Sequence, residues 1–586
     1  MTVIFRANPF ALLICVMLYL PGLASAGKES NRITEAESEP HNWLAHGRTY
    51  AEQRHSPLAE INAETVSRLG LVWAVDMETT RGLEATPLIV DGVLYTSGSW
   101  GIVVAIDARS GKRLWKYDPK VPGHWGRYGC CDVVNRGVAY WNGKIYVASF
   151  DGRLIAIDAK SGQEIWQVST TDKTQPYTST GAPRVVKGKV IIGNGGAEFG
   201  VRGYFSAYDA ASGKMLWRFY TVPASNDGPH ESPAVEKAAA TWSKDTPWEV
   251  GGGGTVWDSM SYDPELDLLY VGVGNGTPWG REIRSPGGGD NLYLSSILAV
   301  DPDDGRLVWH YQTTPGESWD YTATQHILLA DLELDGQTRK VLMQAPKNGF
   351  FYVLDRATGE LLSADKYIDA TWASHVDMKT GRPVETGRAD WSKGPKMVMP
   401  FDPGGHNWPP MSFDSETGLV YVPTHVGGML YKPEDQFSYQ PGAQNIGMDL
   451  PGIFTTLIEG GSGLEEFAVY GELQAWDPVA RKKVWGVIHP RAINGGVLTT
   501  AGKLVFQGTG DGRFAAYRTD DGKRLWEIAF GNGILGSPVT YSVDGTQYVS
   551  VLAGWGGAAM IGHDAAKAGR LKYSNNGYLL TFALGG

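Results

Sequence analysis

The chain has 586 residues, which is room for several ordinary domains or for one large repeat fold. Its 52 Lys and Arg against 63 Asp and Glu give a net charge of −11, which repels phosphate backbones and argues against a nucleic-acid partner. Hydrophobic residues make up 42% of the chain and the mean hydropathy is −0.22, which excludes a disordered chain and a bundle of membrane spans. The 76 glycines indicate many tight turns, and therefore short strands rather than long helices.

The first 26 residues have the pattern of a secretory signal. Arg6 supplies the basic charge, the stretch from Phe10 to Leu20 is apolar, and Ala24-Ser25-Ala26 fits a cleavage site of small residues. The apolar stretch is too short to cross a bilayer. We therefore expect residues 27–586 to be exported as a soluble protein into a bacterial-type periplasm, with an uncleaved membrane anchor as the alternative.

A repeat follows, with the template Ala-x-Asp-x-x-Ser/Thr-Gly-x-x-x-Trp. It matches in full at residues 105–115, 156–166 and 207–217 and closely at 299–309, and weaker copies begin at residues 353, 412, 475 and 516. Six of these eight copies end in Trp, in a chain that has 21 Trp. This fixed offset indicates a repeated structural unit.

Each copy is typical of a β-hairpin. The residues up to Asp end one strand, the Asp can cap the turn amides, the Gly takes the left-handed position, and the next strand carries the Trp. Further turn dipeptides, Asn142-Gly143 and Asp151-Gly152, divide residues 139–166 into four short strands. We expect the Trp side chains to pack between neighbouring sheets.

The copies begin 41 to 92 residues apart, and a four-stranded blade needs roughly 40–50 residues. The longest interval contains residues 225–254, which are rich in Pro, Gly and polar residues and are interpreted as an inserted loop rather than a second blade. Eight copies predict a single all-β domain over residues 27–586, an eight-bladed β-propeller with tryptophan-docking repeats. An array of β-sandwiches is the alternative.

Cys130 and Cys131 are the two cysteines that remain once the signal, with Cys15, is removed. A disulfide between neighbours joins Cα atoms only ~3.8 Å apart and links no loop, so it would be strained and would add little global stability. Strain without a gain in stability suggests a functional surface. Two reduced, buried thiols are the alternative.

Carboxylate and amide side chains follow Gly-rich strand ends. Glu198 comes after the sequence Gly-Asn-Gly-Gly-Ala, Asn275 lies between two glycines, and Asp320 lies between Trp and Tyr. Such oxygen donors suit Ca²⁺ better than Zn²⁺. Each residue alone is more often part of a turn, but a propeller would bring these loops together around its axis.

Motifs of other enzyme classes are missing from the sequence. The glycines at 251–254 lack the Lys and the helix of a phosphate-binding loop, and the Gly-x-Gly segments follow strands without a Rossmann helix. There is no His-Glu-x-x-His zinc motif and no Cys-x-x-Cys-His attachment site for covalent haem.

Taken together, these features resemble the quinoprotein alcohol dehydrogenases, which carry pyrroloquinoline quinone (PQQ) and a divalent metal on an eight-bladed propeller. The resemblance covers essentially the whole chain after residue 26. It is carried by Cys130-Cys131, Gly195-Gly196-Ala197-Glu198, Trp319-Asp320-Tyr321 and the Trp repeats, which as an ordered set are far more specific than any one alone.

The resemblance implies a cofactor site. A Cys130–Cys131 disulfide would lie over one face of PQQ, Trp257 would stack on the other, and Lys347 would reach the quinone oxygens. The other positions that match the surroundings of the cofactor are Glu84, Arg136, Thr180, Gly196, Ala197, Asn407, Trp408 and Trp555. The positions that match the calcium ligands are Glu198, Asn275 and Asp320. Without the resemblance, these would be ordinary core, surface or turn residues.

The resemblance also implies the chemistry. Calcium would polarise a quinone carbonyl, Asp320 would take the hydroxyl proton of the alcohol, hydride would pass to PQQ, and Lys347 would stabilise charge on the quinone oxygens. Lanthanide-using relatives have an Asp two residues after the catalytic one, where this chain has Thr322, which favours calcium. A C-terminal cytochrome domain is not expected, so electrons would pass to a soluble cytochrome c.

The predicted function is a periplasmic PQQ-dependent dehydrogenase that oxidises primary or secondary alcohols to aldehydes or ketones. The alternatives are a polyol, sugar or polymer alcohol as substrate, or a non-catalytic propeller scaffold, which would have no use for Cys130-Cys131, Glu198 or Asp320. We expect insertions at residues 225–254, 365–396 and 432–463 to shape the pocket mouth. The preferred alcohol and a homodimeric state are left open.

Overall fold

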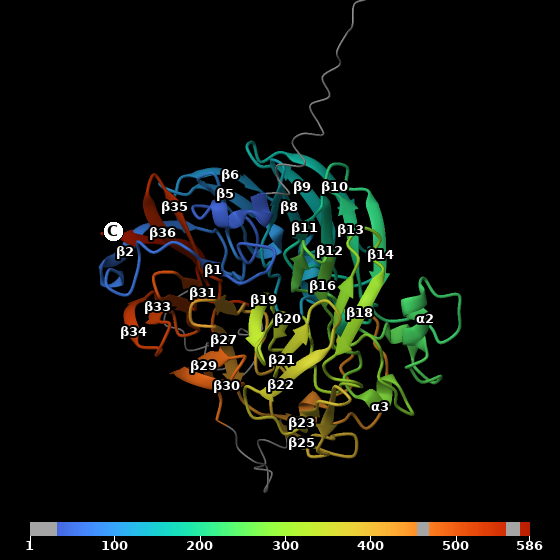
Figure 1. Ribbon diagram of the computed structural model, residues 1–586. Coiled ribbons are helices and arrows are strands. Elements are labelled where there is room, and N and C mark those ends of the chain that lie inside the picture. Colours follow the sequence, from blue (N-terminus) through green and yellow to red (C-terminus); the bar gives the residue numbers. More distant parts are fainter. Residues whose placement is uncertain (1–31, 454–467, 558–574, 586) are drawn as a thin grey trace, which may run out of the picture.

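The computed structural model describes residues 32–453, 468–557 and 575–585. In this part of the chain, eight antiparallel sheets stand like blades around a common axis (Figure 1). The first strand of each blade lies near the axis, and several of these strands contact the first strand of a neighbouring blade. The prediction of an eight-bladed all-β propeller is confirmed.

The first four blades, from inner to outer strand, are β3–β6 (Leu88–Val90, Val93–Ser97, Val103–Asp107, Arg113–Tyr117), β7–β10 (Ala139–Trp141, Lys144–Ser149, Arg153–Asp158, Glu164–Ser169), β11–β14 (Arg184–Val186, Lys189–Gly193, Tyr204–Asp209, Met215–Tyr220) and β15–β18 (Met260–Asp263, Leu268–Gly272, Ser296–Val300, Leu307–Gln312). The other four are β19–β22 (Ile327–Leu334, Gln337–Gln344, Phe350–Asp355, Leu361–Lys366), β26, β27, β29 and β30 (Ser412–Asp414, Leu419–Val426, Tyr470–Asp477, Lys482–His489), β31–β34 (Val497–Thr500, Leu504–Gly508, Arg513–Arg518, Arg524–Ala529), and β35, β36, β37 and β2 (Val539–Val543, Thr546–Ala553, Tyr578–Leu584, Leu69–Asp76).

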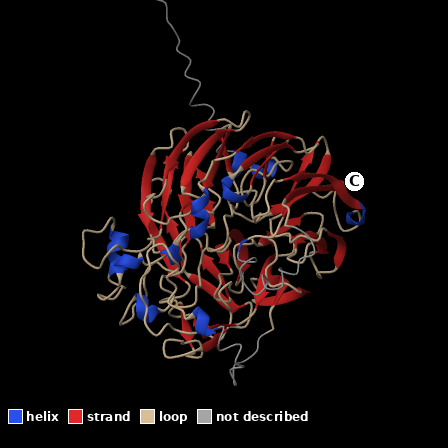
Figure 2. Ribbon diagram, turned by 180° about the vertical axis from the view of Figure 1, so that it is seen from behind, coloured by secondary structure: helices blue, strands red, loops and turns tan. Residues whose placement is uncertain are grey.

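Smaller elements lie outside the four main strands of each blade. β1 (His55–Ser56) adds to β31 in parallel, and two further two-stranded sheets pair β23 (Ala373–Asp377) with β24 (Arg382–Glu385) and β25 (Lys396–Val398) with β28 (Met429–Tyr431). The short helices, shown in Figure 2, include α2 (Pro233–Ala239), α3 (Arg281–Arg284) and the 3-10 turns η1 (Ala36–Ser38), η2 (Val66–Arg68), η3 (Ser99–Gly101), η4 (Gly123–Tyr128), η5 (Ala197–Phe199) and η6 (Trp248–Val250). The interval at residues 225–254 contains α2 and η6 and no strand, so its interpretation as a loop is confirmed.

The repeat forms a hairpin, as predicted, and in seven of the eight copies it is the outer hairpin of a blade. Oδ1 of Asp107 accepts hydrogen bonds from the backbone N and the hydroxyl of Ser110, at 2.8 and 2.6 Å, and Gly111 has a φ of +72°. The Trp of one blade packs on the turn Gly of the next: a Cβ placed on Gly162 would lie 2.6 Å from the ring of Trp115. The indole N–H of Trp115 donates to the carbonyl of Ala159 at 3.0 Å, so this turn receives the Trp of its neighbouring blade.

The eight copies and the eight blades do not correspond one to one. The copies at 412–422 and 475–485 lie in the same blade, as its inner and outer hairpins, because the same Asp-to-Gly turn suits either position. The blade without a copy is completed by β2, which pairs with β37 and so joins the two ends of the described chain. Its Trp73, in β2, packs on Gly111 of the following blade, so a Trp–Gly contact links these two blades as well.

Strand direction places the functional loops. Neighbouring strands of a blade are antiparallel, so the connection between its second and third strands opens at the same end as the connection to the next blade. The repeat hairpins lie at the opposite end. Loops from several blades therefore meet around one end of the axis.

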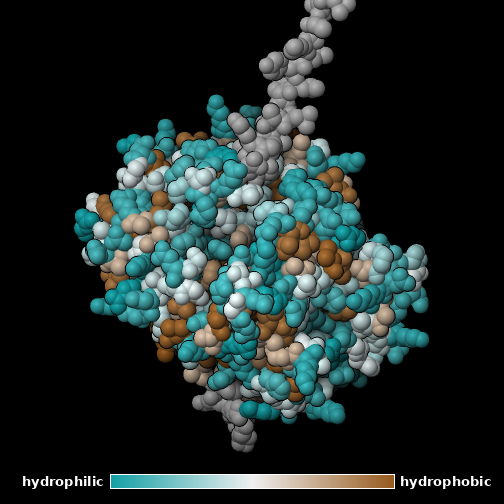
Figure 3. All heavy atoms as spheres, in the orientation of Figure 1, coloured by the Kyte–Doolittle hydropathy of each residue, from teal (hydrophilic) through white to brown (hydrophobic). Residues whose placement is uncertain are grey.

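The signal predicted at residues 1–26 lies outside the described residues. Among the described helices, none is long and apolar enough to cross a membrane. The face visible in Figure 3 is largely hydrophilic, with small separate hydrophobic patches.

Candidate active site

The loops at the end of the axis away from the repeat hairpins enclose a cavity of about 920 Å³, measured out to its open mouth. The predicted site residues that line it are Cys130, Cys131, Arg136, Thr180, Gly196, Glu198, Trp257, Asn275, Asp320, Lys347, Asn407 and Trp408. Three predicted residues are not in its lining. Glu84 lies behind Arg136, Ala197 is buried between two lining residues, and Trp555 packs in one buried cluster with Trp408.

A cation and two indoles form one part of the wall. The guanidinium of Arg136 lies 5.0 Å from the ring centre of Trp257 and 5.4 Å from that of Trp408. Its Nη1 donates to the hydroxyl of Thr180 at 2.9 Å. This arrangement offers a positive charge next to apolar ring faces, which suits a flat ligand that carries carboxylates.

Glu84 supplies a buried acid behind this wall. Nη2 of Arg136 lies 3.0 Å from Oε2 of Glu84, yet neither carboxylate oxygen receives a well-aligned hydrogen bond. Burial raises the pKa of Glu84 to about 7, although the charge of Arg136 opposes this, and burial also raises the pKa of Asp258 to about 7. A buried acid without a hydrogen-bond partner fits a site where a polar ligand supplies the missing partner.

Glu198, Asn275 and Asp320 gather on another part of the wall. The amide nitrogen of Asn275 donates to Oε1 of Glu198 at 2.9 Å, and Nζ of Lys347 donates to Oδ2 of Asp320 at 2.8 Å. Burial raises the pKa of Asp320 well above its usual range, against the opposing charge of Lys347, and nearby Glu198 raises it further. Although burial opposes it, the pKa of Lys347 is raised by Asp320. Two carboxylates and an amide oxygen are hard donors that fit a calcium ion.

The paired cysteines lie at the cavity as free thiols in this structure. Their sulfur atoms are 2.8 Å apart, longer than the ~2.05 Å of a disulfide bond. The disulfide stays a prediction.

Comparison with known proteins decides the family. A family model, PQQ, described as the β-propeller domain of glucose/ethanol/alcohol dehydrogenases, matches residues 43–364 and 469–549. The quinohemoprotein alcohol dehydrogenase ADH IIB of Pseudomonas putida is 55% identical over 98% of this chain and 82% of its own length.

The chain belongs to the PQQ-dependent (quinoprotein) alcohol dehydrogenases.

Two further relatives agree. A 1-butanol dehydrogenase (cytochrome c) of Thauera butanivorans is 46% identical to this alcohol dehydrogenase over 93% of the chain and 78% of its own length. The solved structure of quinohemoprotein alcohol dehydrogenase ADHIIG from Pseudomonas putida superposes with a TM-score of 0.91 at 52% identity, covering 95% of this chain and 82% of that one. The predicted family and enzyme class are thereby confirmed.

Some residues of the dehydrogenase's cavity were not found from the sequence. Tyr128, Phe150 and Phe199 add aromatic surface, and Asp132 and Asp402 add two aspartates to the lining. Burial raises the pKa of Asp402, although the charge of Lys347 opposes this. In the sequence, Asp402 precedes Pro403 and has the pattern of a turn residue, so no local signal distinguishes it.

The insertions brace the ligand-bearing loops of the dehydrogenase from behind. In their described parts, none of the three contributes a residue to the cavity lining. The backbone N of Asn445 donates to the carbonyl of Glu198 at 2.6 Å, and that of Gly254 donates to Asn275 at 2.8 Å. The indole of Trp391 donates to the carbonyl of Ser318 at 2.9 Å. Residues 454–463 of the third insertion lie outside the described residues.

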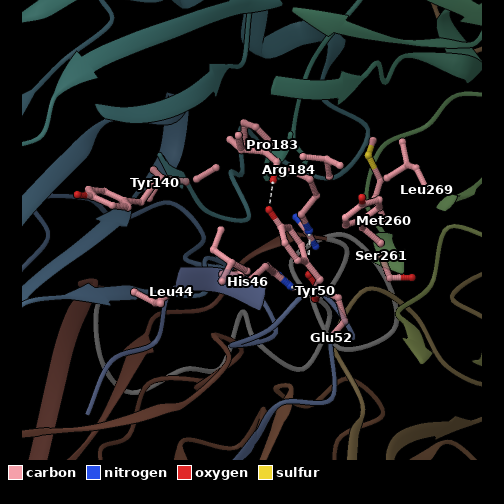
Figure 4. Close-up of a pocket in the computed structure, with 17 residues that line it drawn as sticks. Leu44, His46, Tyr50, Glu52, Tyr140, Pro183, Arg184, Met260, Ser261 and Leu269 are labelled. Carbon is pink, nitrogen blue, oxygen red and sulfur yellow. Dashed lines mark hydrogen bonds and ion pairs between the residues drawn. The ribbon is translucent and has the colours of Figure 1, made fainter. Parts of the chain in front are cut away.

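A second cavity of the dehydrogenase contains a buried His and Glu (Figure 4). His46 and His326 lie 2.9 and 3.2 Å from Oε2 of Glu52, which resembles a metal site. However, Nε of Arg184 lies 2.9 Å from Oε1 of Glu52, and burial lowers the pKa of His46 to about 3. The carboxylate is already neutralised by Arg184, so the cluster serves to anchor residues 46–52 in the propeller.

Proposed function

We propose that this enzyme is a periplasmic, calcium- and PQQ-dependent dehydrogenase that oxidises primary or secondary alcohols to aldehydes or ketones and passes the electrons to a cytochrome c. The observation that carries this proposal is the cavity itself, where Glu198, Asn275 and Asp320 face one space with the Arg136 wall. The name of the Thauera butanivorans relative, a 1-butanol dehydrogenase (cytochrome c), supports both the alcohol substrate and the electron acceptor.

The residues that would hold the cofactor follow from the wall geometry. Trp257 and the Cys130–Cys131 pair would contact its two faces, and Arg136 with Thr180 would bind its carboxylates. Glu84, next to Arg136, would contact the same rim, where the cofactor would supply a partner for its carboxylate oxygens. Glu198, Asn275 and Asp320 would hold calcium. Gly196, Ala197, Asn407, Trp408 and Trp555 would complete the surroundings.

The side chains of the cavity suit proton removal from an alcohol. Asp320 would take the hydroxyl proton of the alcohol, and Lys347 holds its carboxylate in place through Oδ2. When bound, the quinone supplies the hydride acceptor and calcium supplies a Lewis acid. The raised pKa of Lys347 keeps its ammonium charged, next to the position where negative charge would develop. Phe150 and Phe199 offer an apolar surface for the alkyl part of the substrate.

Reconstitution tests the proposal. Apoenzyme given PQQ and CaCl₂ should reduce a dye with alcohols such as 1-butanol, and omission of either component should abolish this. The panel of substrates should include secondary alcohols, polyols, sugars and a polymer alcohol. A reconstituted enzyme that turns over only sugars or polyols would replace the alcohol assignment, and one that needs no PQQ would overturn the cofactor.

We also propose that the exported chain begins after residue 26 and that residues 27–586 act as one domain. The mass of protein purified from the periplasmic fraction tests the first point. A cytoplasmic location or an intact N-terminus would contradict it.

A further inference from the structure

Two neighbouring loops carry two of the proposed calcium ligands. Asn275 lies between β16 and β17, and Asp320 lies between β18 and β19. Asp320 has a φ of +63°, a conformation that residues other than Gly rarely adopt, so its loop needs support from its surroundings.

The carboxylate of Glu317 joins these loops. Its Oε2 accepts hydrogen bonds from the backbone N of Trp319 at 3.0 Å and of Tyr321 at 3.2 Å, the residues on either side of Asp320. Its Oε1 accepts one from the backbone N of Gly276 at 2.7 Å, the residue after Asn275. Each oxygen of one carboxylate therefore holds one ligand-bearing loop.

Glu317 itself is fixed from behind. Its side chain is fully buried, and Nη1 of Arg284, also buried, lies 3.8 Å from its Oε1. The guanidinium of Arg284 also donates to the carbonyls of Pro278 at 2.6 Å, Trp279 at 2.9 Å and Glu317 at 2.5 Å. This buried charge pair ties both loops to α3, so the carboxylate cannot move without breaking several hydrogen bonds.

We propose that Glu317 is a positioning residue that sets the distance between Asn275 and Asp320 and thereby the affinity of the site for calcium. The proposal rests on the calcium site of the proposed function. Glu317 does not line the cavity and would not touch the ion. Residues that orient metal ligands in this way typically change metal affinity about 10- to 100-fold when they are replaced.

Asp263 provides a matched control. It is buried, its Oδ1 accepts from the backbone N of Glu265 at 2.8 Å and of Leu266 at 3.1 Å, and its Oδ2 pairs with Nε of Arg356 at 2.5 Å. It resembles Glu317 in burial, charge and partners, but its hydrogen bonds do not reach the loops of Asn275 and Asp320. A merely structural role for Glu317 predicts the same effects from both residues.

The test compares Glu317→Gln with Asp263→Asn. Apoenzyme with PQQ is titrated with CaCl₂, and the rise in the midpoint of thermal unfolding gives the half-saturating calcium concentration without any activity assay. We expect Glu317→Gln to raise this concentration about 10- to 100-fold, because an amide supplies only one acceptor oxygen. Asp263→Asn should lower the unfolding midpoint but leave the half-saturating calcium concentration within about twofold of the wild type. Effects of distant substitutions add to within a few tenths of a kcal/mol, which corresponds to about this factor.

Glu317→Asp is the second variant, in case the amide does not fold. It keeps the charge but is one methylene shorter, so it cannot reach both loops and should also weaken calcium binding. Equal half-saturation in wild type and Glu317 variants, or equal weakening by Asp263→Asn, would overturn the positioning role alone. A wild-type protein whose midpoint does not respond to calcium would overturn the proposed calcium site as well.

Discussion

Asp320 and Lys347 form the charge pair on which the proposed chemistry depends. Replacement of Asp320 by Asn removes the base but keeps the size of the side chain. We expect the Asp320→Asn variant to lose about 10²- to 10⁴-fold in turnover while it still binds PQQ, measured by the absorbance of the bound quinone and by dye reduction. Asp402→Asn is the control, since Asp402 lines the same cavity and its carboxylate forms no ion pair with another described residue. Comparable turnover in both variants would remove Asp320 from the role of base.

The raised pKa of Glu84 leads to a prediction about how the stability of the enzyme depends on pH. Its pKa of about 7 in the folded enzyme exceeds the ordinary 4.5, so the unfolded chain releases this proton at lower pH than the folded one. Its contribution to stability therefore falls as pH rises from about 4.5 to 7 and is constant above that, by about 3 kcal/mol at most. We expect the Glu84→Gln apoenzyme to lose less stability than the wild type between pH 4.5 and pH 8 in urea unfolding. Parallel pH profiles of the two proteins would contradict this.

At the scale of the element, the Trp–Gly contact links one blade to the next. Gly162 and Gly143 both have positive φ, +74° and +71°, but only Gly162 lies under a Trp ring. Gly143→Ala should cost about 1–2 kcal/mol for the left-handed backbone alone, and Gly162→Ala should cost about 1–3 kcal/mol more because its methyl group displaces Trp115. Urea unfolding of both variants measures the difference. Equal losses would mean that Trp docking on this turn does not stabilise the ring.

At the scale of the whole molecule, β2 and β37 close the ring. Ala74 pairs with Leu580 and Val75 with Leu579, and neighbouring N–H groups of a strand point to opposite sides. One of the two variants Ala74→Pro and Val75→Pro should therefore lose a hydrogen bond between β2 and β37, which should lower the free energy of unfolding by about 3 kcal/mol. The other variant should lose much less stability. Thermal unfolding followed by Trp fluorescence and by circular dichroism should show one common, lowered transition in the first variant. Two unaffected variants would show that closure by β2 contributes little.

Local sequence patterns predicted much of the fold. The Asp107-to-Gly111 turn needs a capping oxygen and a residue with positive φ, so its residue types alone predict a hairpin. The Trp four residues after the Gly predicts a contact between sheets. The same reasoning could not assign copies to blades. The turn at 412–422 is locally the same as the others but lies in an inner hairpin, and β2 completes a blade from the far end of the chain.

The sequence by itself determined the repeat and the propeller, because turn chemistry and side-chain type are local properties, and a family resemblance supplied the residues proposed for the site. Only the tertiary structure decided that Asp402 reaches the cavity, that Cys130 and Cys131 line it, and that Glu317 joins the loops of Asn275 and Asp320. These features depend on burial and on backbone groups from different blades, and such contacts between distant segments leave no pattern in neighbouring residues.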